Sequence, residues 1–130
     1  MKTFAFPKSF RLLTPKDYSE VFNDVQIRVP HRHFLILATP NSVGHARVGL
    51  VFSKKNLRLS VQRNRVKRLV RETFRARTDL PPVDIVVLSR QGLASLPNAE
   101  LHPLLNGLWQ RLKKKSDQLQ RSKSQPDTAS

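Results

Sequence analysis

The chain has 130 residues, of which 38% are hydrophobic, and this suits one domain without a second core or a large substrate cavity. Its 24 Lys and Arg residues outnumber its 9 Asp and Glu residues, which gives a formal net charge of +15. A charge of this size indicates a polyanionic partner. Nucleic acid, an anionic membrane surface and an acidic protein are all candidates at this point.

The opening segment lacks the apolar run of a signal peptide, and no later stretch approaches the ~20 consecutive apolar residues of a membrane-spanning helix. Secretion and membrane spanning are therefore not expected. The absence of cysteine excludes a disulfide framework, a thiolate metal site and a cysteine nucleophile. It also fits a reducing compartment, so we expect a cytoplasmic protein.

The first predicted element is a helix that begins after Thr14, the expected N-cap, with Pro15 at the first helical position. It is expected to run to about Asn23. Apolar and aromatic residues recur at helical spacing in and before this helix and predict a core-facing stripe. They are Leu13, Tyr18, Val21 and Phe22.

Three short apolar runs, residues 34–39, 47–53 and 83–89, are rich in branched side chains and predict strands. A brief earlier strand is predicted near residues 26–28. The sequence Leu-Pro-Pro at 80–82 stops any helix that precedes the last strand. A long helix is therefore expected between the second and third of these runs.

A last helix is predicted to start at Asn98 and to run to about Lys115. Its apolar residues follow an i, i+3, i+4, i+7 pattern: Leu101, Leu104, Leu105, Leu108, Trp109 and Leu112. Residues 116–130 are polar and predict a disordered tail, which leaves residues 1–115 as one domain. The element order indicates an α+β protein, an α/β sandwich with helices packed on a small sheet.

The segment from residue 54 to residue 77 holds 10 of the 24 basic residues and one acid. On a helix its side chains separate into two opposite arcs. The apolar arc, expected to pack on the sheet, comprises Val66, Leu69, Val70 and Phe74. The polar and cationic arc comprises Asn64, Lys67, Arg68, Arg71 and Arg75.

A helix face that only contacts solvent normally mixes charges of both signs, because like charges at i, i+4 repel. Here Lys67, Arg71 and Arg75 follow one another at that spacing. A bound polyanion would convert this repulsion into attraction, and guanidinium groups match phosphate geometry. A nucleic-acid contact is therefore favoured over a solvated face.

The ordered set of basic motifs resembles the signature of bacterial ribonuclease P protein subunits. The central match is the run Arg-Asn-Arg-Val-Lys-Arg at 63–68, followed by Arg-Glu at 71–72 and Phe-Arg at 74–75. The likeness covers residues ~1–112. Its other parts are Arg11-Leu12-Leu13, Val21-Phe22, residues 44–50, Lys54-Lys55, residues 84–87 and Leu108-Trp109.

The resemblance implies a small mixed four-stranded sheet with three helices, in which the basic helix links two parallel strands by a left-handed crossover. It implies partnership with a catalytic RNA that hydrolyses precursor tRNA and holds most of the required magnesium. The protein then binds this RNA and the 5′ leader of the precursor tRNA. No catalytic residue, metal site, small-molecule substrate or cofactor is expected on the protein itself.

By motif match, the family implies two binding surfaces. The surface for RNA comprises Lys54, Lys55, Arg63, Asn64, Arg65, Lys67, Arg68, Arg71 and Arg75. The cleft for the single-stranded leader comprises Tyr18, Phe22 and Phe34. Without the resemblance, aromatic residues at these positions would be assigned to the core.

The residues themselves give no nuclease site. His31 and His33 lack an adjacent carboxylate, and the acids show no close pairing typical of a two-metal centre. The main alternative is a ribosomal or other structural RNA-binding protein, which would share the size and charge. A DNA-binding regulator is disfavoured because no helix-turn-helix spacing is present, and membrane-surface binding because the apolar arc is short.

Overall fold

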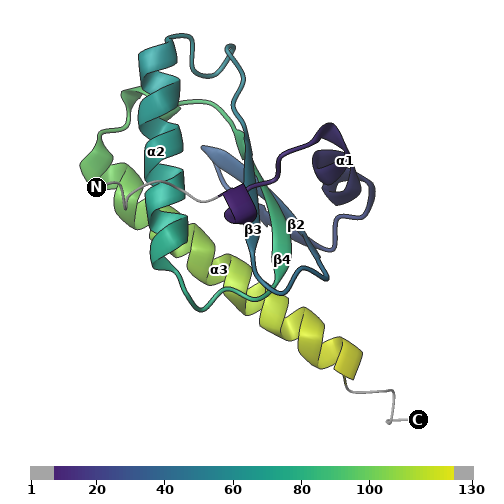
Figure 1. Cartoon of the computed structure of the whole chain (residues 1–130). Helices are drawn as coiled ribbons and strands as arrows, with labels where there is room; N and C mark the ends of the chain where they lie inside the picture. Colours follow the sequence, from purple (N-terminus) through teal and green to yellow (C-terminus); the bar gives the residue numbers. More distant parts are fainter. Residues whose placement is uncertain (1–7, 125–130) are drawn as a thin grey trace, which may run out of the picture.

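Four short apolar segments pair into one mixed sheet in the computed structural model, which describes residues 8–124 (Figure 1). The strands are β1 (Ile27–Pro30), β2 (Phe34–Pro40), β3 (Arg47–Val51) and β4 (Val83–Ser89), in the order β1-β2-β4-β3. β2 pairs antiparallel with both β1 and β4, whereas β3 pairs parallel with β4. The four predicted strands are confirmed, including the brief first one.

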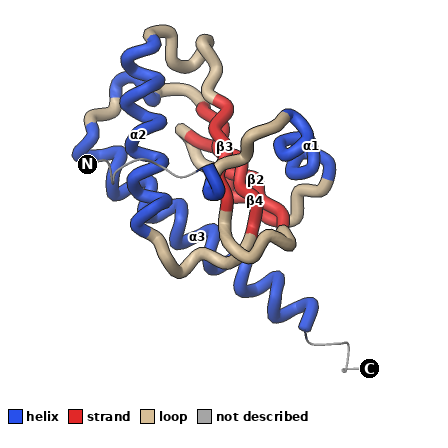
Figure 2. The backbone as a smooth tube through the Cα atoms, in the orientation of Figure 1, coloured by secondary structure: helices blue, strands red, loops and turns tan. Residues whose placement is uncertain are grey.

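The helices lie on both faces of this sheet, as the colours of Figure 2 show. They are η1 (Lys8–Phe10), α1 (Pro15–Asn23), α2 (Ser60–Ala76), η2 (Leu93–Ser95) and α3 (Asn98–Ser124). One face carries α1, and the other carries α2 and α3 (Figure 1). The predicted α+β sandwich is confirmed. No helix within residues 8–124 is both long and apolar enough to cross a membrane.

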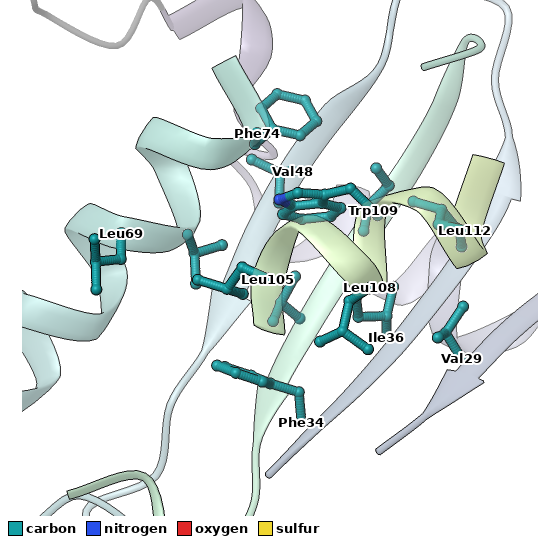
Figure 3. Close-up of a cluster of buried hydrophobic side chains, with 14 of the residues drawn as sticks. Val29, Phe34, Ile36, Val48, Leu69, Phe74, Leu105, Leu108, Trp109 and Leu112 are labelled. Atoms are coloured by element: carbon teal, nitrogen blue, oxygen red, sulfur yellow. The ribbon is translucent and has the colours of Figure 1, made fainter. Parts of the chain in front are cut away.

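Alternation along β2 determines which side chains face which helices. Phe34 and Ile36 point into the larger core beneath α2 and α3 (Figure 3), and Ala38 belongs to the same core. Leu37, from the alternate positions, packs in the smaller core beneath α1 together with Val21. The sheet therefore has two buried faces and a different set of contacts on each.

A buried hydrogen bond joins α2 to α3. The indole Nε1 of Trp109 donates to Oγ1 of Thr73 at 2.8 Å, and this hydroxyl donates to the backbone oxygen of Leu69 at 2.8 Å. Phe74 lies edge-on to the Trp109 ring, with 5.6 Å between the centroids. Trp109 is the largest fully buried side chain of the cluster in Figure 3, and the hydrogen bond to Thr73 satisfies its indole N–H.

The parallel pair β3 and β4 is tied by a buried ion pair. Arg47 and Asp84 are register partners, and the guanidinium donates from Nε and Nη2 to the two carboxylate oxygens at 2.8 and 2.7 Å. Asn41 donates a further hydrogen bond to Asp84 at 2.7 Å. These contacts compensate the buried carboxylate and favour the pairing of strands that lie far apart in sequence.

The disordered tail predicted from residue 116 is wrong for residues 116–124, which continue α3 to Ser124. Ser116 is buried and Leu119 packs against the larger core. With Leu112, these residues extend the buried face at intervals of four and three. Because Ser116 is polar, a prediction that counts only apolar residues ends the buried face at Leu112. Residues 125–130 lie outside the described part of the chain.

Replacing Thr73 by valine tests the link between α2 and α3. The change preserves the side-chain shape but leaves the buried indole N–H of Trp109 without its acceptor. We expect the free energy of unfolding to fall by about 1–3 kcal/mol. Chemical denaturation measures this, with Thr73→Ser, which keeps the hydroxyl, as the control. Equal stability of Thr73→Val and the parent protein would contradict the assigned role.

Candidate nucleic-acid interface

A groove of about 540 Å³ runs along the outer face of α2. Every member of the predicted polar arc lines it: Asn64, Lys67, Arg68, Arg71 and Arg75. Glu72 and Arg11 complete the lining. The opposite face of α2 buries Val66, Leu69, Val70 and Phe74, as the periodicity predicts. Burial of one face thus leaves the cations aligned on the other, in the groove that we call the α2 groove.

Arg11 joins the α2 groove from a distant part of the sequence. The segment between η1 and α1 runs along the outer edge of β3, where Leu12 N donates to Val48 O at 3.1 Å (Figure 1). This pairing places the guanidinium of Arg11 opposite α2. Arg11 belongs to the motif match but not to the predicted binding surface. The motif match was the signal in the sequence that could have indicated its role.

Arg71 lines the α2 groove together with Arg11. Burial, followed by the charge of Arg11, lowers the pKa of Arg71 from its usual value, while the adjacent Tyr18 acts in the opposite direction. The guanidinium remains charged, because arginine does not lose its proton in proteins. A phosphate in the groove would offset the repulsion between Arg71 and Arg11 and would place an opposite charge beside the partly buried guanidinium.

The α2 groove continues toward α1 through a smaller hollow between α2 and β3. Arg11, Lys67 and Arg71 line both spaces, and Tyr18 and Gly49 line the second. The tyrosine ring rests on the backbone of Gly49, where an added Cβ would lie 2.6 Å from Cε2 of Tyr18. Glycine is therefore required for this close approach. The basic groove and the aromatic face of α1 form one connected surface.

The aromatic surface comprises Tyr18 and Phe22 but not Phe34. Phe22 is 44% exposed, so the prediction that it faces the core is wrong, as it is for Leu13, which is 56% exposed. Phe34 is fully buried on the opposite face of the sheet, 6.4 Å from Phe52 between ring centroids. Its assignment to the leader cleft is wrong, because alternation along β2 turns it toward α2 and α3.

Two arginines of the predicted set have hydrogen bonds that stabilise the fold. Arg65 donates to the backbone oxygens of Leu96 and Leu93 at 2.8 and 3.5 Å, and to Oδ1 of Asn98 at 2.8 Å. Arg63 donates to the carbonyls of residues 57 and 58, at the connection that leads into α2. Both side chains lie outside the α2 groove.

Lys54 and Lys55 are exposed in the loop before α2 and do not line the α2 groove.

His31 and His33 lie in the turn between β1 and β2, with 5.6 Å between their ring centroids. Within residues 8–124, no three His, Cys, Asp or Glu side chains gather into a possible metal site.

The fold and the α2 groove define a small basic α+β protein that presents a row of cations to an extended polyanion. The model of the ribonuclease P family matches residues 6–113. The chain is 68% identical to the ribonuclease P protein component of Marinobacter nauticus over 115 residues, 88% of this chain and 87% of that protein. It belongs to the family of ribonuclease P protein components.

Further relatives and solved structures agree with this assignment. The ribonuclease P protein component of Pseudomonas aeruginosa is 49% identical over 82% of this chain and 80% of its own length. The structure of the Staphylococcus aureus RNase P protein matches with a TM-score of 0.75 and 27% identity, covering 82% of this chain and 97% of that one. The Thermotoga maritima RNase P protein matches with a TM-score of 0.67, 28% identity and coverages of 80% and 96%.

Arg65 and Arg68 provide a matched pair for separating stability from RNA binding. Arg65→Ala should lower the free energy of unfolding by about 1–3 kcal/mol, because it removes charge-assisted hydrogen bonds to the start of α3. Arg68 is exposed in the α2 groove, so Arg68→Ala should leave stability unchanged and weaken RNA binding. Denaturation and RNA titration of both variants test this. If Arg68→Ala were less stable than Arg65→Ala, the structural role assigned to Arg65 would be refuted.

Proposed function

We propose that this chain is the protein subunit of ribonuclease P, a ribonucleoprotein endoribonuclease, and that it assists removal of the 5′ leader from precursor tRNA. The observation that carries this proposal is the α2 groove, formed by the motif that identifies the family. The partners are the catalytic RNA and the precursor tRNA. An unrelated structural RNA-binding protein would not share family membership over residues 6–113.

The α2 groove suits the phosphates of an RNA strand. It presents cations from two segments, Arg11 on one wall and the outer face of α2 on the other, and Glu72 of α2 is the one acid of the lining. Guanidinium groups bind phosphates through paired hydrogen bonds, and neutralised phosphates release counterions. We assign direct RNA contact to the groove residues Asn64, Lys67, Arg68, Arg71 and Arg75, and also to the loop residues Lys54 and Lys55.

The face of α1 suits unpaired bases of the leader. Phe22 exposes 44% of its surface beside the partly exposed Tyr18, and the floor beneath them is apolar, with Leu37 and Val86 buried. Stacking of a base on an aromatic side chain contributes ~1–3 kcal/mol and tolerates any base. Such a surface accepts leaders of different sequence.

Chemistry in this proposal belongs to the RNA. Hydrolysis of a phosphodiester needs an activated water and stabilisation of the leaving oxygen, which divalent ions supply. The described residues offer no cluster of ligands for such ions. We therefore assign magnesium mainly to the RNA and give the protein the tasks of neutralising phosphates and holding the leader.

Reconstitution tests the proposed function directly. Purified protein added to the catalytic RNA of the same genome should restore cleavage of precursor tRNA at magnesium concentrations where the RNA alone is slow. The physical reason is that protein cations reduce the repulsion between two RNAs. Appearance of the mature 5′ end on a gel measures the effect. Cleavage that is unchanged by the protein would refute the proposal.

Phe22→Ala tests the leader surface. Loss of one stacked base should weaken binding of precursor tRNA with a long leader by roughly tenfold, corresponding to ~1.4 kcal/mol. Binding of leaderless tRNA should not change. Phe22→Tyr keeps the aromatic ring and should bind both substrates like the parent protein. An equal loss of affinity for both substrates in Phe22→Ala would place the defect elsewhere.

A further inference from the structure

A second group of cations lies at the turn between β1 and β2, and we call it the hairpin patch. It comprises Arg32, Arg90, Arg111 and Lys115, together with the partly buried His31. Within the patch, a shallow hollow of about 420 Å³ is lined by Pro30, His31, Arg32, Arg90 and Gln91. It shares no lining residue with the α2 groove.

Contacts from two other elements hold the hairpin patch together. Three side chains from outside the hairpin donate to its backbone carbonyls: Arg90 to His31 at 3.2 Å, Arg111 to Pro30 at 3.4 Å, and Lys115 to Arg28. Arg90 follows β4, whereas the other two donors lie one turn apart on α3. Cations from the turn, the end of β4 and α3 therefore converge on one place.

The charge of the hairpin patch is not balanced by acids. Among the ion pairs of the described residues, none involves Arg32, Arg90, Arg111 or Lys115. Burial, and then the positive charges of His33, Arg111 and Arg32, lower the pKa of His31, which indicates how closely these groups approach. Like charges held together without acids are unfavourable unless an anion is bound among them.

The loop before α2 brings further cations to the same end of the sheet. Ser53 N donates to Oγ of Ser89 at 3.0 Å, and Nδ2 of Asn56 donates to the backbone oxygen of Ser89 at 3.0 Å. Lys54 and Lys55 lie between these two anchors, and Ser89 directly precedes Arg90. Basic residues therefore continue from the start of α2, past the end of β4, to the hairpin.

We propose that the hairpin patch is a second binding site for RNA phosphates, and that bound RNA extends from α2 around this end of the sheet onto β1 and α3. This inference rests on the proposed function for the nature of the RNA. Phosphate is the favoured ligand because the hollow offers guanidinium groups and no acid among its lining residues. Continuity with Lys54 and Lys55 favours RNA over an acidic protein.

Salt-dependent binding to the catalytic RNA tests this site. Arg32 is exposed and makes no side-chain hydrogen bond within the described residues, so Arg32→Ala removes charge without disturbing the hairpin. The slope of log affinity against log salt should become shallower by ~0.7–0.9 for each lost phosphate contact. Arg90→Ala and Arg111→Ala should act in the same direction. Lys16→Ala removes one exposed charge from α1, where Lys16 lies 4.0 Å from a carboxylate oxygen of Glu20, and should change the slope less.

A chemical probe tests the position of the RNA. The chain contains no cysteine, so Arg32→Cys and Lys16→Cys each provide one attachment point for an iron chelate that cleaves nearby RNA. Cleavage should be strong from position 32 and weak from position 16. Equal behaviour of the two positions in both experiments would overturn the hairpin site. Failure of the parent protein to support cleavage of precursor tRNA would instead overturn the proposed function, so the two failures are distinguishable.

Discussion

The packing of one face of α2 against the sheet and α3 fixes the position of every cation that α2 contributes to the groove. Val66, Val70 and Phe74 are buried, and Thr73 receives the indole hydrogen bond of Trp109. With this face fixed, the helical repeat leaves Lys67 and Arg71 no alternative to the solvent side. The functional surface is therefore a consequence of core packing, and an error in the core would rotate the cations away from one another.

Periodicity predicts this part of the molecule well because it concerns neighbours on one helix. The same reasoning fails where a contact depends on a distant segment. Arg65 belongs to the basic motif, yet its partners are η2 and the start of α3, about thirty residues further along the chain. Phe34 is aromatic and was expected in the leader cleft, but its position in β2, which pairs with β4, turns its side chain to the face of the sheet that α2 and α3 cover.

The end of α3 and the membership of the α2 groove also depend on contacts with distant segments rather than on neighbours in the same helix. Ser116 is polar and suggests the end of a helix, whereas the structure buries it between Leu112 and Leu119. Arg11 precedes the first helix and enters the groove only because its segment pairs with the edge of β3. In both cases the decisive contact is tertiary. Composition and spacing indicate that the partner is a nucleic acid, while the packing on the sheet determines which cations line the surface that would contact it.

The contact between Tyr18 and Gly49 has a geometric consequence. With no Cβ between them, the ring contacts the main chain of β3 directly, while it also packs against the smaller core. The separation between the phosphate groove and the stacking surface is thereby set in part by the main chain. A bound RNA strand would meet the phosphate groove and the stacking surface at a spacing to which the backbone of Gly49 contributes directly.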